Sequence, residues 1–321
     1  MSSVNSAEIF CQNKEAKKQE KLLKKALKFS PDDSLVISNC GDFYFENERY
    51  SEALEYFLRS LGVDDKNAEV YYKAGKCFLA KNLLNDAISY FEKAVFFNEE
   101  EPLFLSELAR LYYKKNDFQK AQKAFEKLIM LVPESAWAYS NLGNIYFYHM
   151  NDVETAYKYY AFAVDSDPEY DWGLYNLASV KVLFKEFEEA ITLYRHACEI
   201  SPNNELFQFA LAHTYYRAGF VDEAINLLKK LLEKNENNED YLFCLGKMYF
   251  CDKKDNMIAK RYFEKAKLLD ENNAEIYYYL AKILFFDFDR KNAIINISRA
   301  LELDNDNDRY KALKNKIDDM E

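Results

Sequence analysis

Hydrophobic and small residues recur along the chain at helical spacing. In residues 39–61 this spacing predicts two helices joined by a tight turn. The first helix holds Gly41 and Tyr44, and the second holds Ala53 and Phe57. Residues four apart share one face of a helix, so Ala53 and Phe57 are expected to point the same way. Because no stretch of useful length alternates between apolar and polar residues, the pattern predicts an all-α fold.

The alanine of this stretch returns at a nearly constant interval. Successive intervals are 34, 34, 35, 34, 34, 35 and 34 residues. The alanines are Ala53, Ala87, Ala121, Ala156, Ala190, Ala224, Ala259 and Ala293. A large apolar residue stands four positions after each: Phe57, Phe91, Phe125, Tyr160, Tyr194, Leu228, Phe263 and Ile297. A fixed period of this length is typical of a solenoid, in which each unit buries its hydrophobic face against its neighbours.

A second small residue precedes each alanine. It stands twelve positions earlier, or thirteen in the two 35-residue units, where we expect the extra residue in the intervening turn. These residues are Gly41, Gly75, Ala109, Gly143, Ala178, Ala212, Gly246 and Ala281. Antiparallel helices approach closely only where small residues leave room. We therefore expect Gly or Ala to face Ala across each pair, with the large residue beside that contact.

The repeated pattern, with Pro133, Pro168 and Pro202 after three of the second helices, resembles the tetratricopeptide repeat. The fourth unit matches the family's signature at Tyr139, Leu142, Gly143, Tyr146, Ala156, Tyr160, Ala163 and Pro168. The resemblance implies a right-handed α-α superhelix. It covers eight units, which are 34–67, 68–101, 102–135, 136–170, 171–204, 205–238, 239–273 and 274–307.

The two ends of the chain depart from the full repeat. Residues 1–33 resemble a degenerate N-terminal repeat or cap, because Ala26 and Pro31 fall in register while the first helix is too polar. Residues 308–321 are expected to form a C-terminal solvating helix. Its apolar stripe consists of Tyr310, Leu313 and Ile317. Terminal repeats need such a polar outer face.

Composition narrows the functional classes. The 321 residues carry a net charge of −11, which argues against a nucleic-acid partner that binds through its phosphates. No run of 18 apolar residues predicts a membrane span, and the first residues lack the apolar run of a signal peptide. The six cysteines are scattered without a C-x-x-C pair, as expected of reduced thiols. We therefore expect a cytoplasmic protein.

No pattern of catalytic residues stands out. His149, His196 and His213 belong to three different units, and His196 and Cys198 are two apart, which makes a poor chelate on a helix. The glycine-rich phosphate-binding motifs and the G-x-S-x-G nucleophile motif are absent from the sequence. We predict that the protein is not an enzyme and uses no cofactor or metal.

The resemblance implies that the first helix of each unit lines a concave groove. At the ninth position of the eight units, four residues are Lys or Arg and one is acidic. The predicted groove residues are Lys73, Lys76, Arg110, Lys114, Trp137, Asn141, Asn144, Trp172, Asn176, Ser179, His213, Arg217, Lys247 and Lys282. Aromatic residues would supply contact area, and the cations would fix the position of the partner and attract it electrostatically. Such a groove suits a protein or peptide partner with acidic residues.

Alternative interpretations of the same residues stay open. The polar and aromatic positions can serve packing alone, or the chain can be an architectural subunit that uses its outer faces or ends. RNA binding by helical repeats is disfavoured by the acidic charge. A clamp for the C-terminal carboxylate of a chaperone is not expected. Ser140, Leu206 and Ala210 stand where chaperone-binding relatives have cations. The oligomeric state is left open.

Overall fold

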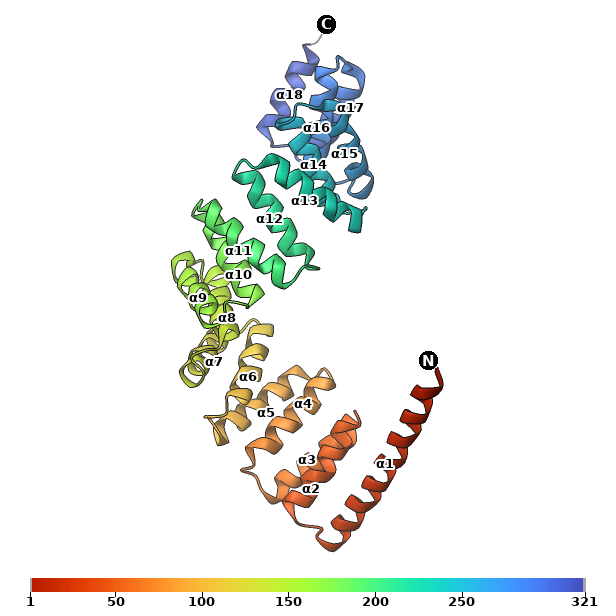
Figure 1. Ribbon diagram of the computed structural model, residues 1–321, viewed down its shortest axis with the longest axis vertical. Coiled ribbons are helices and arrows are strands. Elements are labelled where there is room, and N and C mark those ends of the chain that lie inside the picture. Colours follow the sequence, from red (N-terminus) through yellow and green to blue (C-terminus); the bar gives the residue numbers. More distant parts are fainter. Residues whose placement is uncertain (1, 320–321) are drawn as a thin grey trace. The chain divides into compact units, whose positions relative to one another are not determined.

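The protein is known as a computed structural model that describes the backbone of residues 2–319 and the side chains of residues 15–319. All regular structure in this part of the chain is helical (Figure 1). Contacts divide the chain into two units, residues 1–168 and 169–321. In both, most helices have 13 or 14 residues and follow one another with turns of a few residues between them.

The first unit contains nine α-helices and one short π-helical segment in its described residues. They are α1 Ser2–Phe29, α2 Ser34–Glu46, α3 Tyr50–Val63, α4 Ala68–Ala80, α5 Leu84–Phe97, α6 Pro102–Lys114, α7 Phe118–Leu131, α8 Ala136–Asn144, the π-segment Ile145–His149, and α9 Val153–Ser166. After α1 the helices pack in consecutive pairs, and successive pairs within this unit contact each other through α3 and α4, α5 and α6, and α7 and α8.

The second unit continues the paired arrangement over its described residues. Its helices are α10 Asp171–Leu183, α11 Phe187–Ile200, α12 Glu205–Arg217, α13 Val221–Lys234, α14 Glu239–Cys251, α15 Asn256–Leu269, α16 Ala274–Phe286, α17 Arg290–Leu303 and α18 Asp308–Asp318. The last helix, α18, packs on α17 and α16. It buries Tyr310, Leu313 and Ile317 and leaves most of its other side chains exposed.

The two helices of a pair meet at the small residues, but with a different partner from the one expected. A Cβ atom placed on Gly143 would lie 2.4 Å from the ring of Tyr160, and one on Gly41 would lie 2.6 Å from the ring of Phe57. The nearest atoms to these glycines therefore belong to the aromatic ring, whereas alanine was expected there. The alanine one turn before each ring, such as Ala53, is fully buried.

The turns within the pairs require left-handed backbone geometry. One residue in each has a positive φ: Glu48, Asn82, Asn116, Asn151, Lys185, Gly219, Lys254 and Phe288. Asparagine and glycine tolerate this conformation at little cost, which explains four of the eight. The other four positions hold residues with a long or bulky side chain at a strained φ, and Phe288 is 86% exposed there.

The extra residue of the two longer units is accommodated in two different ways. Between α14 and α15 the turn has four residues, as expected, in place of the three that separate α2 from α3. After α8, in contrast, the turn keeps three residues and the helix itself widens into the π-segment. The backbone N–H of Met150 then donates to the carbonyl of Ile145 at 3.1 Å. For this unit the expected location in the turn is wrong.

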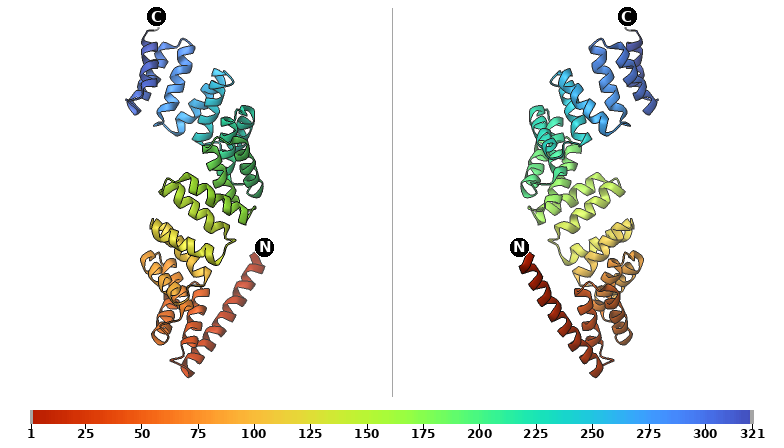
Figure 2. Two further views of the ribbon diagram at one scale, coloured as in Figure 1. Left: turned by 90° about the vertical axis from the view of Figure 1, so that its left-hand side faces the viewer. Right: turned by 90° about the vertical axis from the view of Figure 1, so that its right-hand side faces the viewer.

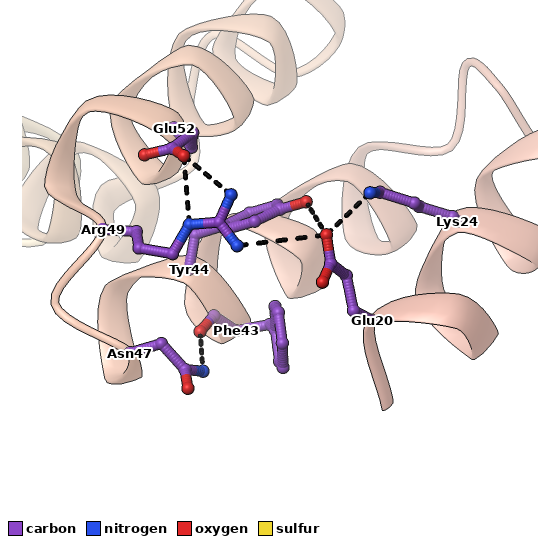
Figure 3. Close-up of polar contacts among 7 residues, drawn as sticks. All are labelled: Glu20, Lys24, Phe43, Tyr44, Asn47, Arg49 and Glu52. Carbon is purple, nitrogen blue, oxygen red and sulfur yellow. Dashed lines mark hydrogen bonds and ion pairs between the residues drawn. The ribbon is translucent and has the colours of Figure 1, made fainter. Parts of the chain in front are cut away.

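The N-terminal segment holds a single continuous helix, where a complete unit would have two. Its C-terminal half docks on α2 and on the turn before α3 through Glu20, whose carboxylate accepts from the Tyr44 hydroxyl at 3.0 Å and lies 3.9 Å from Arg49 (Figure 3). Tyr112 makes the equivalent bond to Glu92 of α5 at 2.6 Å. This half of α1 therefore occupies the place of a second helix.

Candidate partner-binding surface

A hollow of about 280 Å³ opens in the second unit between α10 and α12. Its lining comes from inner positions of the two first helices and from one residue of α11. The lining residues are Tyr175, Val182, Tyr194, Leu206, Phe209, Ala210, His213 and Thr214. Half of them are aromatic or imidazole rings, so the hollow offers a flat-sided pocket for an apolar or aromatic group.

The hydroxyl groups around this hollow are held by the fold. Ser179 Oγ donates to the carbonyl of Tyr175 at 2.9 Å and lies 2.8 Å from the hydroxyl of Tyr194. Because the Ser179 proton is used on the carbonyl, the Tyr194 hydroxyl is the donor to Ser179. Thr214 Oγ1 donates to the carbonyl of Ala210 at 2.8 Å. The floor is thus fixed, and it presents rings and methyl groups.

The rim of the hollow is positively charged. His213 is exposed at its edge, with Arg217 one turn further along α12 and Lys247 on α14. Desolvation by the packed side chains, together with Arg217 and Lys247, lowers the pKa of His213. Among the residues that the structure describes, neither Arg217 nor Lys247 has a carboxylate within ion-pair distance. The guanidinium of Arg217 lies 5.2 Å from the ring centre of Phe187.

Two of the four predicted basic residues of the first unit are paired with carboxylates of the chain. Lys73 Nζ lies 2.8 Å from a carboxylate oxygen of Asp42, and Arg110 Nε donates to Glu107 at 3.0 Å. Lys76 Nζ sits 5.6 Å from the ring centre of Tyr72. Lys114 is exposed at the end of α6. The two ion pairs reduce the positive charge that this unit presents, whereas Lys76 and Lys114 keep theirs.

The predicted asparagine and tryptophan residues also serve the fold. Asn141 Nδ2 donates to the carbonyl of Trp137 at 2.7 Å, and Asn144 Oδ1 accepts from the hydroxyl of Tyr160 at 2.9 Å. Asn176, in the second unit, is buried. The ring of Trp137 packs edge-on against Phe125. The amide groups of Asn141 and Asn144 are therefore partly used before any peptide could bind them.

His213 is the one predicted residue among those that line the hollow, and Trp172 and Lys282 contact rings elsewhere in the second unit. Trp172 is 43% exposed and packs edge-on against Phe207. Lys282 lies over the ring of Phe250, 5.2 Å from its centre. The structure thus places His213 at the hollow and Ser179 beneath it, in contact with Tyr194. Lys282 lies on a later helix, α16.

Comparison with known proteins identifies the repeat. Models of the tetratricopeptide repeat match residues 41–102 and 182–242, and a model of the TPR repeat matches residues 109–149. The chain belongs to the tetratricopeptide repeat family. The eighteen α-helices of its described residues are consistent with eight helix pairs between a first and a last helix. A search of the curated proteins gave no match.

Three solved structures with similar folds are two tetratricopeptide repeat proteins and one multi-subunit assembly. A tetratricopeptide repeat protein from Parabacteroides merdae ATCC 43184 is 17% identical with a TM-score of 0.55, over 78% of this chain and 99% of that one. The APC/C hetero-tetramer Cut9-Hcn1 has a chain that is 17% identical with a TM-score of 0.54, over 94% of this chain and 59% of that one. YrrB, a TPR protein with an unusual peptide-binding site, is 21% identical with a TM-score of 0.51, over 59% of this chain and 96% of that one. Such identities support the fold alone.

Proteins built from tetratricopeptide repeats generally act as non-enzymatic interaction scaffolds. In the described part of this chain, no group of three or more His, Cys, Asp or Glu side chains could hold a metal ion. No described helix is both long enough and apolar enough to cross a bilayer.

Two of the histidines considered as metal ligands contact other side chains of the protein. The ring of His149 stacks on the ring of Phe118, with 3.4 Å between ring centres, and His196 lies 3.3 Å from Glu169.

Tyr194 is the residue of the hollow that the repeat pattern placed elsewhere. It stands four positions after Ala190, so the pattern assigned it to the core, where it is indeed 3% exposed. Its ring nevertheless forms part of the hollow's lining. In the sequence Tyr194 carries the same signal as the other large residues four positions after an alanine, so the pattern did not distinguish it from them.

Proposed function

We propose that this tetratricopeptide repeat protein is a non-enzymatic adaptor that binds an acidic segment of a partner protein at the hollow beside His213. The observation that supports this most strongly is the pair Arg217 and Lys247. Both lack a carboxylate partner among the described residues, beside an aromatic hollow, in a chain with net charge −11. Cations that the fold leaves without a counter-charge favour an anionic ligand.

The residues around the hollow divide the recognition between them. An apolar or aromatic side chain of the partner would enter between Tyr175 and Phe209, where burial of rings supplies most of the contact energy. A neighbouring carboxylate would accept from the guanidinium of Arg217 and from Lys247. The preferred ligand therefore contains Asp or Glu close to a large apolar residue.

Binding of an anion beside His213 should take up protons. The pKa of His213 is lowered in the free protein, and a nearby carboxylate would raise it. The complex then holds more protons than the free protein at mildly acidic pH, so affinity should rise as pH falls from about 7 to about 6. His213→Gln should remove this part of the pH dependence.

Selection from a displayed library of random peptides tests the proposal. We expect the wild-type protein to enrich peptides with Asp or Glu near an aromatic or large aliphatic residue. Arg217→Glu/Lys247→Glu should weaken the selected peptides at least about tenfold, since charge-assisted hydrogen bonds contribute about 1.5–3 kcal/mol each. Lys230→Glu/Lys265→Glu, with the same charge change on exposed sites of α13 and α15, is the control. Equal loss in both variants would contradict the proposal.

We do not propose a chaperone tail as the ligand. Leu206 and Ala210, where chaperone-binding relatives have cations, are apolar residues of the hollow. They leave a terminal carboxylate without its usual partners at those positions. For the compartment we propose the cytosol. The five cysteines whose side chains are described, with Cys40 and Cys77 among them, form no disulfide.

A second candidate function is that of an architectural subunit, supported by apolar side chains at the ends of second helices. Phe96 of α5 is 80% exposed and Met130 of α7 is 78% exposed. They stand 34 residues apart and so occupy equivalent positions in successive pairs. A tetramer or hetero-assembly that buries these side chains would be disrupted by Phe96→Ser/Met130→Ser. Native mass spectrometry of the assembly purified from cells would detect this, while peptide binding at the hollow would be unchanged.

A further inference from the structure

A row of lysines runs along α1 at the N-terminal end of the first unit. Within residues 14–28 the lysines are Lys14, Lys17, Lys18, Lys21, Lys24, Lys25 and Lys28. At 3.6 residues per turn, these positions fall within an arc of about 120° and extend for about 21 Å along the helix axis. Glu15 and Glu20 are the acidic residues in this stretch, so it carries +5 in a chain with net charge −11.

The fold uses little of this charge. Glu20 turns away from the row toward Tyr44 and Arg49, and Lys24 Nζ joins it at 2.6 Å (Figure 3). The lysines Lys17, Lys18, Lys21 and Lys28 are exposed and form no ion pair with another described residue. The cluster at Glu20 therefore holds α1 in place while it leaves most of the lysine row facing solvent.

Apolar side chains border the lysine row on one edge. Leu22 is 60% exposed and Phe29 is 78% exposed, and helical spacing puts both beside the row. Lys25 Nζ lies 6.0 Å from the ring centre of Phe29. On the opposite face, Ala16 and Leu23 pack against the core of the unit. Figure 2 shows α1 diverging from its neighbours toward its N-terminal end. The helix thus has a docked face, a lysine face and an exposed apolar edge.

We propose that α1 binds an anionic phospholipid surface, with the lysine row against the headgroups and Leu22 and Phe29 inserted at their boundary with the acyl chains. Four to eight basic residues on an amphipathic helix are the usual requirement for such binding. The surface is a different one from the hollow beside His213, and the proposal does not depend on the partner bound there.

The side chains of the row favour lipid over a nucleic acid. All seven cations are lysines, which act as point charges and so suit the spread negative charge of a lipid surface, whereas arginine holds a single phosphate in the bidentate geometry common in nucleic-acid recognition. Of the two exposed apolar residues, Phe29 could stack on a base but Leu22 could not, whereas both can enter the boundary of a bilayer. A straight row on one side of a helix also matches a flat surface, because Lys17, Lys21 and Lys28 can reach the plane together.

Vesicle sedimentation with the full chain tests the proposal. Vesicles of phosphatidylcholine with about one third phosphatidylserine are compared with phosphatidylcholine alone, at about 0.15 M and about 0.5 M salt. We expect binding to the anionic vesicles that weakens at the higher salt. Lys17→Glu/Lys21→Glu/Lys28→Glu should reduce it by at least about 100-fold, since each lysine near such a surface contributes about fivefold. At the higher salt, where the lysines contribute less, Leu22→Ser/Phe29→Ser should bind the anionic vesicles more weakly than the wild type does.

The matched control changes the same charge elsewhere. Lys123→Glu/Lys230→Glu/Lys265→Glu replaces exposed lysines of α7, α13 and α15 and should bind the vesicles nearly as the wild type does. Circular dichroism checks that each variant is folded, and glutamine replaces glutamate if the lysine-row variant is not. Failure of the wild type to bind anionic vesicles, equal loss in the control, or binding to single-stranded RNA in place of vesicles would each overturn the proposal.

Discussion

Replacement of Gly143 by alanine tests the packing rule of the repeat most sharply. The added Cβ would lie 2.4 Å and 2.5 Å from two carbon atoms of the Tyr160 ring, where an ordinary contact begins at 3.4 Å. The ring is 2% exposed and its hydroxyl donates to Asn144, so it cannot move without disturbing that bond. Either α8 and α9 must separate by about 1 Å or the ring must leave its rotamer.

The size of the effect follows from two opposing contributions. Overpacking of this kind costs about 1–3 kcal/mol, and alanine gains up to about 1 kcal/mol over glycine in helix propensity. The 2.4 Å approach to a buried ring places the overpacking cost in the upper part of its range, about 2–3 kcal/mol, so Gly143→Ala should lower stability by about 1–2 kcal/mol. In α3, a methyl group added at Gly62 would meet no other atom within 4 Å, so Gly62→Ala should be neutral or stabilise by up to about 0.5–1 kcal/mol.

Thermal melting and hydrogen exchange measure this difference. Because repeat proteins lose structure locally, exchange of the amides in α9 reports the perturbed pair better than a global midpoint alone. Gly143→Ala should accelerate exchange in α9, and Gly62→Ala should not. A Gly143→Ala protein as stable as the wild type would show that the close approach of ring and glycine does not limit the distance between the helices.

Three further predictions concern single residues of the second unit. Ala190→Leu, at a fully buried position, should destabilise by about 1–3 kcal/mol in urea unfolding, and a neutral result would mean that the repeat register is wrong. Phe288→Asn should raise the melting temperature, because φ is 59° there and the phenylalanine is exposed; a fall would contradict the strain argument. The lowered pKa of His213 means that the unfolded state binds more protons just below pH 6.5, so stability should fall with pH from about 7 to about 5 by more than in His213→Gln.

The repeat itself could be predicted from the sequence because its signal is redundant. Eight alanines at a common interval, each with a large residue four positions later, leave one consistent pairing of helices. The contacts between the two helices of a pair were harder to predict from the sequence. Whether Gly143 faces Ala156 or the ring of Tyr160 depends on the rotation of each helix, which the period alone does not determine.

The candidate surface was predicted only in outline. Residue type at an inner position indicates charge, but it does not show whether a neighbour neutralises that charge. Arg110 and Arg217 looked alike in sequence, and Glu107 pairs with the former while the latter has no carboxylate partner among the described residues. The lysine row of α1 lies outside the eight repeats, so their period gives no signal for it, although its own helical spacing can be read directly from the sequence.

The hollow beside His213 is the surface at which we expect the partner to be held. The most direct test introduces a photo-crosslinking amino acid at His213 in one protein and at Phe96 in another, followed by crosslinking in cells and mass spectrometry. We expect His213 to yield crosslinks to an acidic segment of a partner protein, and Phe96 to yield none to that segment. Crosslinks to a partner from Phe96, with none from His213, would contradict the proposed binding site and favour the architectural role.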